Sequence, residues 1–120
     1  MDKPLAIETV NNYLKKNLLN NRNTNYSKIN ASKDVWWFNI DPERFQNELH
    51  LILKKGTGFI WITIPEEKYQ KPERVFKIRE DKNLVDIEIS ASPGMMYLRD
   101  IKSGSTGFYF KPYIVKTFEV

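Results

Sequence analysis

Residues 35–64, VWWFNIDPERFQNELHLILKKGTGFIWITI, carry the strongest local patterns in the chain and decide its predicted fold class. The first part, residues 34–40, and the last part, Gly58–Ile64, are rich in β-branched and aromatic side chains. Such side chains are enriched in strands because they pack well on a pleated surface. We therefore expect one strand at each end of the stretch.

Between these two strands the sequence predicts a helix from Asp41 to Gly56. An aspartate at the N-cap followed by a proline at the first helical position, Asp41-Pro42, is a typical helix start. Gly56 suits the left-handed conformation that ends many helices. Apolar residues recur between them at helical spacing: Phe45, Leu49, Ile52 and Leu53. The stretch is therefore interpreted as a β-α-β unit.

The N-terminal quarter is interpreted as a helix followed by a polar loop. Residues 4–19 carry one apolar stripe at helical spacing, formed by Ile7, Val10, Leu14 and Leu18. Residues 20–33 show no period and are almost wholly polar. They predict a loop that is unusually long for a compact domain.

Two hairpins are expected in the second half of the chain. The first pairs residues 74–79 with residues 84–90, in a register that sets Ile78 opposite Val85 and Lys77 opposite Asp86. Apolar residues then share one face, and opposite charges meet on the other. The second hairpin pairs residues 95–102 with residues 108–115. Pro112 places the last strand at an edge or bends it.

These elements follow the order α-β-α-β-β-β-β-β and predict a single α+β domain over residues 1–120. The sheet is expected to be mixed and mostly antiparallel. It is expected to be curled or shaped as a partly open barrel, with two helices packed on it.

The composition excludes several classes of site. The chain has no cysteine, which excludes disulfides, iron–sulfur clusters, cysteine zinc sites and a thiol nucleophile. No apolar run approaches the roughly 18 residues that span a bilayer, and the first residues lack the apolar region of a signal peptide. We therefore expect a soluble, cytoplasmic protein with no membrane, metal or cofactor partner.

The net charge of +4 is confined to the N-terminal quarter. Residues 1–33 carry six basic and two acidic side chains, whereas residues 34–120 carry thirteen of each. A basic segment on a neutral body is one pattern of nucleic-acid contact. The abundance of Asn, Lys and Ile also fits the AT-rich codons of a low-GC genome, which would produce the same excess without any binding role. A bacterial or phage origin is expected.

One face of the predicted sheet is a candidate surface for stacking nucleobases. Phe59 and Trp61 alternate with isoleucines and point to the other face, where Trp37 can join them. Exposed aromatic side chains near basic residues stack bases in many domains. The predicted nucleic-acid-binding residues are Lys15, Lys16, Arg22, Lys28, Lys33, Trp37, Phe59 and Trp61. The same aromatic residues also suit core packing, a protein or dimer interface, or a flat ligand.

The sequence offers no catalytic motif. His50, the only histidine, is expected in the second helix, where Glu48 at two residues' distance does not face it. The glycines of residues 54–58 follow the predicted helix, whereas a phosphate-binding loop precedes one. Asp86 and Glu88 are outward carboxylates, but Glu88 lacks the lysine two residues later that metal-dependent nucleases of the common type carry.

The sequence therefore favours a small, non-enzymatic binding module that engages nucleic acid through the basic segment and the aromatic face. A protein-interaction module, such as an inhibitor, an immunity protein or an accessory subunit, is the alternative. A small nuclease or toxin that uses His50 or Glu88 is the third hypothesis. The sequence distinguishes neither DNA from RNA nor monomer from dimer.

Overall fold

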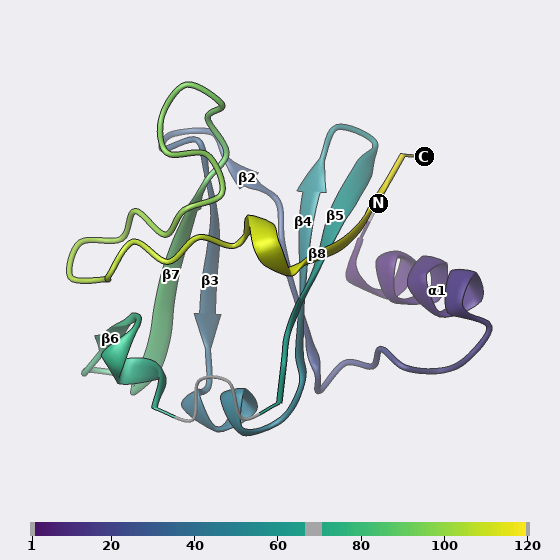
Figure 1. Cartoon of the computed structure of the whole chain (residues 1–120), viewed down its shortest axis with the longest axis horizontal. Coiled ribbons are helices and arrows are strands. Elements are labelled where there is room, and N and C mark those ends of the chain that lie inside the picture. Colours follow the sequence, from purple (N-terminus) through teal and green to yellow (C-terminus); the bar gives the residue numbers. More distant parts are fainter. Residues whose placement is uncertain (1, 67–70, 120) are drawn as a thin grey trace.

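The computed structural model describes residues 2–66 and 71–119, which form one α-helix and two four-stranded sheets (Figure 1). The helix is α1 (Lys3–Leu14). Sheet A has the strand order β1 (Thr24–Ser27), β4 (Leu49–Lys55), β5 (Gly58–Ile64) and β8 (Ile114–Phe118). Sheet B has the order β2 (Ile29–Asn30), β3 (Val35–Ile40), β7 (Leu84–Ser90) and β6 (Lys77–Arg79). Short 3-10 turns are η1 (Pro42–Gln46), η2 (Pro72–Arg74) and η3 (Lys111–Tyr113).

Sheet A is built on the hairpin of β4 and β5. Gly56 turns the chain between these strands with a φ of +60°, a conformation that favours glycine. β1 runs parallel to β4 on one side, and β8 runs antiparallel to β5 on the other. The end of β8 lies so close to β5 that a Cβ at Gly58 would overlap the carbonyl oxygen of Phe118. Gly58 is therefore required for the approach of β8.

Sheet B is antiparallel throughout its described strands. β3 and β7 pair from Val35 opposite Ser90 to Ile40 opposite Val85. Only Lys28 separates β1 from β2, so one nearly continuous segment forms an edge strand of both sheets. This segment joins the two sheets along one side of the molecule.

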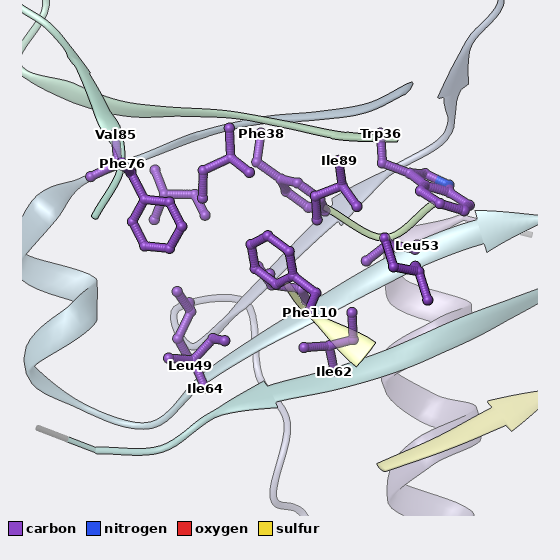
Figure 2. Packing of buried hydrophobic residues seen from close by; sticks show 14 of the residues in the cluster. Trp36, Phe38, Leu49, Leu53, Ile62, Ile64, Phe76, Val85, Ile89 and Phe110 are labelled. Carbon is purple, nitrogen blue, oxygen red and sulfur yellow. The ribbon is translucent and has the colours of Figure 1, made fainter. Parts of the chain in front are cut away.

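The main core lies between the two sheets. Inward side chains of β3 and β7 meet those of β4 and β5, as Figure 2 shows for Trp36, Phe38, Leu53, Ile62 and Ile89. Each fully buried side chain of this kind contributes about 1.5–3 kcal/mol relative to an exposed one. This shared core holds the two sheets face to face.

α1 covers the other face of sheet A. Its buried residues Ala6 and Val10 pack with Ile52, Phe59 and Trp61 in a second apolar cluster. The molecule therefore has three layers in the order α1, sheet A and sheet B (Figure 1). No helix of the described residues covers the outer face of sheet B.

The structure corrects the predicted helix between Asp41 and Gly56. Asp41 does accept a hydrogen bond from the Glu43 backbone N–H at 2.9 Å, but the turn that it starts is η1, which ends at Gln46. β4 follows, and residues 49–53 are all buried because the main core lies on one side and α1 on the other. A strand buried on both faces shows no polar alternation. The apolar residues of β4 also matched helical spacing, which is why a helix was predicted. No β-α-β unit forms, because β3 and β4 belong to different sheets.

The N-terminal quarter also differs from the prediction. α1 ends at Leu14, because Lys15 takes a left-handed φ of 58° and its N–H caps the last turn. The Asn11 side chain then bonds both backbone groups of Leu19 and turns the chain back along the helix. The predicted polar loop of residues 20–33 contains β1 and β2, whose polar side chains hid their strand character.

The two predicted hairpins have different outcomes. β6 and β7 form the first hairpin, with Ile78 opposite Val85 and Lys77 opposite Asp86 as expected. The second is wrong as a regular hairpin: Arg99 and Tyr109 form one isolated bridge, and β8 pairs with β5 instead. The single α+β domain is confirmed, whereas the second helix is not, and the two sheets form no closed barrel.

Candidate binding face

The outer face of sheet B is the open face of the structure and carries Trp37. The strand β3 alternates, so its neighbours Trp36 and Phe38 point into the main core while Trp37 points outward. Trp37 keeps 47% of its surface exposed, whereas Trp36 is fully buried and Trp61 keeps 3%. An exposed tryptophan is unusual, because this large side chain is mostly buried on average.

A buried carboxylate fixes the Trp37 side chain. The indole Nε1–H donates to Asp86 Oδ1 at 2.7 Å, and Asn39 Nδ2 donates to the same oxygen at 3.1 Å. Lys102 Nζ lies 3.3 Å from Asp86 Oδ2. The Trp37 backbone N–H also donates to Ser27 Oγ at 3.1 Å. The indole edge and backbone are therefore held in place, and the ring face is what Trp37 offers to a ligand.

The charges around Trp37 are largely paired. Glu88 lies opposite Trp37 in the register, and its Oε2 accepts from Lys33 Nζ at 3.1 Å. Lys102 neutralises Asp86, and Arg79 donates to Asp81 at 3.2 Å on the same sheet. The Arg79–Asp81 pair is solvent-accessible, and such pairs contribute only about 0–1 kcal/mol to stability, whereas the Asp86 carboxylate is buried. The main effect of these ion pairs here is a face with little net charge.

An exposed apolar group lies beside these ion pairs. Met95 is 71% exposed, and Met96 and Ile101 are also exposed. Together with Lys33 they line a pocket of about 330 Å³, and the Ile101 backbone N–H donates to the Glu88 carbonyl at 2.8 Å. This places the group next to the residue opposite Trp37. In Figure 1 the green segment after β7 loops past the β2–β3 end of sheet B.

The loop that carries the methionines is held in a defined conformation. Ser90 Oγ donates to the Met95 carbonyl at 2.6 Å, and the Arg99 N–H donates to the Met96 carbonyl at 3.0 Å. Met96 has a φ of 52° and Leu98 a φ of 64°, both in the left-handed region that few such residues adopt. The buried Leu98 side chain anchors the loop in the main core. The exposed methionines are therefore presented by an ordered loop.

A groove lies on the other side of Trp37, where β1 passes into β2. Its volume is about 720 Å³. The residues that line it are Asp2, Tyr26, Ser27, Lys28, Ile29, Asn30, Ala31 and Trp37. Burial and the nearby Asp2 carboxylate raise the pKa of the Tyr26 phenol. The tyrosine therefore stays neutral at the pH values at which proteins work.

The structure separates the residues predicted to bind nucleic acid. Phe59 and Trp61 were expected on an open face, and this placement is wrong because α1 covers them. Lys15 and Lys16 follow the last turn of α1, on the opposite side of the two sheets from Trp37. Arg22 lines a separate polar pocket of about 440 Å³ near η1. Of the predicted set, Lys28, Lys33 and Trp37 lie on or beside one face.

His50 lies in β4, not in a helix, and its contacts are those of a structural residue. Glu48 lies directly before β4, and residues two apart along an extended chain share a face. His50 Nε2 is 3.1 Å from Glu48 Oε1, although without the angles of a hydrogen bond. Trp61 Nε1–H, which can only donate, bonds Nδ1 at 3.1 Å, and Thr63 Oγ1 lies 2.9 Å from the same atom. Nδ1 is therefore the acceptor, and the neutral ring carries its proton on Nε2. Burial lowers the pKa of His50, and Glu48 offsets part of that effect.

Asp100 is the other buried ionisable group with a shifted pKa. Its Oδ1 accepts from the backbone N–H groups of Glu88 and Lys102 at 3.1 and 3.0 Å, and Oδ2 has no hydrogen-bond partner. Burial raises its pKa to about 6, against the opposing effect of these hydrogen bonds. The carboxylate ties the segment after the methionine loop to β7.

Within residues 2–66 and 71–119, no three His, Cys, Asp or Glu side chains gather in a way that could hold a metal ion. Over the same residues, α1 falls short of the length and apolar character of a membrane-crossing helix.

The exposed apolar group was missed by the sequence reasoning. Met95 and Met96 lie in a segment that was interpreted as the start of a strand, where alternate residues would have been buried. A methionine pair directly after the turn residues Ser92-Pro93-Gly94 was the signal available for an exposed loop. No known protein family, curated protein or solved structure matches this chain in sequence or in fold.

Proposed function

We propose that this chain is a protein-interaction module that binds its partner through the outer face of sheet B. The observation that supports this most is Trp37, an exposed indole held at a fixed position by the buried carboxylate of Asp86. A side chain that is already ordered loses little entropy on binding. Trp37 is therefore prepared to act as an anchor.

The surroundings of Trp37 resemble the anatomy of a protein interface. Interfaces are enriched in aromatic residues and methionine at their centre and are surrounded by a polar rim. Met95, Met96 and Ile101 provide further exposed apolar surface, and the Lys33–Glu88 pair lies between them and Trp37. Large exposed apolar patches on a small domain commonly mark binding sites. An inhibitor, an immunity protein or an accessory subunit would use a face of this kind.

Nucleic-acid binding by the full predicted set of residues has weaker support. A ligand would have to reach Trp37 and the lysines at the end of α1, which lie on opposite sides of the two sheets. Phosphate contacts need uncompensated cations. On the Trp37 face, Lys33 and Lys102 are paired with Glu88 and Asp86.

The test is quantitative capture of partner proteins by the tagged chain from the cells that produce it. We compare the wild-type chain with Trp37→Ala and Met96→Glu. The matched control is Val115→Glu, because Val115 is 51% exposed but belongs to β8 of sheet A. Removal of an anchor tryptophan weakens an interface by about 2 kcal/mol or more. Circular dichroism confirms that each variant is folded.

The proposal predicts a protein that wild type and Val115→Glu retain and that Trp37→Ala and Met96→Glu lose. Sedimentation of the purified protein shows whether the partner is a second copy of the chain. Equal capture by all four chains would contradict the proposal. Retention on heparin that falls steeply with salt, without any such protein, would instead favour nucleic acid.

A further inference from the structure

The groove between the start of α1 and the β1–β2 segment shares Trp37 with the proposed partner face and supports a separate inference about a small ligand. We propose that this groove binds a nucleotide, with the planar base stacked on Trp37 and the phosphate at Lys28. Both residues line the groove.

The groove has room for such a ligand. Its volume of about 720 Å³ lies within the range of roughly 300–1,000 Å³ that is usual for small-molecule sites. Ile29 and Ala31 line it together with polar side chains. This combination of apolar surface with a few polar groups is typical of ligand sites.

The chemistry of Trp37 selects a ligand with a flat face. Its Nε1–H is already used by Asp86, and its backbone N–H is used by Ser27, another residue of the groove. The indole therefore has no hydrogen bond left to give, and it binds by stacking. Every nucleobase has a π face that stacks on an aromatic ring.

Lys28 selects a ligand with an anionic group. Among the described residues that line the groove Lys28 is the only cation, and within that part of the chain its ammonium group has no hydrogen bond or ion pair. Lys33, the next lysine along the chain, is already paired with Glu88. An added phosphate would therefore meet an uncompensated charge at Lys28.

Asp2 adds a preference among bases. Its Oδ1 accepts from the Leu5 backbone N–H at 3.0 Å, and the carboxylate lines the same groove. A carboxylate repels phosphate and accepts hydrogen bonds from amino groups. The phosphate must therefore lie towards Lys28, and a base with an exocyclic amine, such as adenine, is favoured over hypoxanthine, which has at that position a carbonyl oxygen that the carboxylate repels.

The same chemistry is found in a free nucleotide and in one residue of a single strand. The experiment therefore titrates the full chain with AMP, with IMP and with a short adenine oligonucleotide, by calorimetry and tryptophan fluorescence. The variants are Trp37→Ala and Lys28→Ala. The matched control is Lys16→Ala, which removes an exposed lysine at the other side of the molecule.

We expect AMP or the oligonucleotide to bind with quenching of Trp37 fluorescence. Trp37→Ala weakens binding roughly tenfold or more, and Lys28→Ala weakens it roughly tenfold, whereas Lys16→Ala has no effect. AMP binds more tightly than IMP. Comparable affinity for AMP and the oligonucleotide identifies a free nucleotide, and much tighter binding of the oligonucleotide identifies a strand.

Failure of this inference is distinguishable from failure of the proposed function. Met96→Glu leaves nucleotide binding unchanged, and Lys28→Ala leaves capture of the partner protein unchanged. Absence of binding for AMP and the oligonucleotide at millimolar concentration would overturn the inference. An equal loss of binding in Lys16→Ala and Lys28→Ala would also overturn it.

Discussion

The outer faces of the two sheets each carry a tryptophan, and these two tryptophans differ in exposure. On sheet A, Phe59 and Trp61 point outward from β5 and are buried by α1. On sheet B, Trp37 points outward from β3 and remains exposed. The two faces differ because α1 covers the outer face of sheet A, whereas no helix of the described residues covers that of sheet B. A tryptophan on a sheet face is therefore a core residue or a binding residue according to what covers it.

The largest effect that tests this comparison is the loss of stability on truncating a tryptophan. Trp61→Ala leaves a cavity beneath α1, and such substitutions cost about 3–5 kcal/mol. Trp37→Ala removes an exposed ring, while Asn39 and Lys102 still pair with Asp86, so we expect about 1 kcal/mol. Urea unfolding monitored by circular dichroism measures both values. Equal losses of stability in the two variants would show that Trp37 and Trp61 are equally buried.

The next effect concerns the pH dependence of stability. The folded-state pKa of Asp100 is raised to about 6, so the folded protein binds this proton more readily than the unfolded chain does. Its stabilising contribution is present below the unfolded pKa and is lost as the pH rises through about 6. Asp100→Asn should therefore gain stability relative to wild type above pH 6, by at most about 3 kcal/mol.

The contribution of His50 to stability changes with pH in the opposite direction to that of Asp100. Its folded-state pKa is lowered, so the unfolded chain binds the proton more readily. Stability is therefore lost as the pH falls below the unfolded value of about 6.5. His50→Gln should remove this loss, and thermal unfolding between pH 5 and pH 8 separates the two groups. An advantage of Asp100→Asn that does not change with pH would contradict the assignment to Asp100.

A smaller effect tests the close approach of β8 to β5 at the edge of sheet A. Gly58→Ala places a Cβ against the carbonyl oxygen of Phe118, so β8 must move and the variant loses about 1–3 kcal/mol. Gly94→Ala is the matched control, because a Cβ there meets no atom within 4 Å. The two variants are compared by urea unfolding. A neutral Gly58→Ala would mean that β8 does not approach β5 this closely.

The smallest effect concerns the ion pair beside Trp37. Lys33→Ala breaks the exposed Lys33–Glu88 pair and should change stability by less than about 1 kcal/mol. Thermal unfolding checks this value. If the variant is as stable as expected, any loss of partner binding shows that Lys33 contributes to the binding face. A large loss of stability would instead show that the Lys33–Glu88 pair is structural.

Parts of the fold followed from local patterns in the sequence. β3 and β5 were predicted because they are rich in β-branched and aromatic residues, and the β6–β7 hairpin because its alternation fits its register. β4 was not predicted, because it is buried on both faces and its leucines and isoleucine also match helical spacing after the helix-start signal Asp41-Pro42. The partner of β8 was not predictable either, since that pairing joins residues far apart in the sequence, such as Phe59 and Phe118.

The candidate site was predicted only in part, because local patterns identify residue types but not how distant elements pack. Trp37 was named because of its residue type and its position along a predicted strand, and Lys28 and Lys33 were named because they belong to the basic N-terminal quarter. The burial of Phe59 and Trp61 depends on where α1 packs, which is a tertiary property. The exposure of Met95 and Met96 depends on the left-handed turn at Met96 and on the buried Leu98. Neither feature leaves a periodic signal in the sequence.

The accessibility of the three tryptophans to a neutral quencher tests the central difference between the two faces most directly. Acrylamide quenching is measured for the wild-type chain, Trp37→Phe and Trp61→Phe. We expect an accessible fraction of the fluorescence in wild type that persists in Trp61→Phe and disappears in Trp37→Phe. An accessible fraction that survives in Trp37→Phe would contradict an open sheet B beside a closed sheet A.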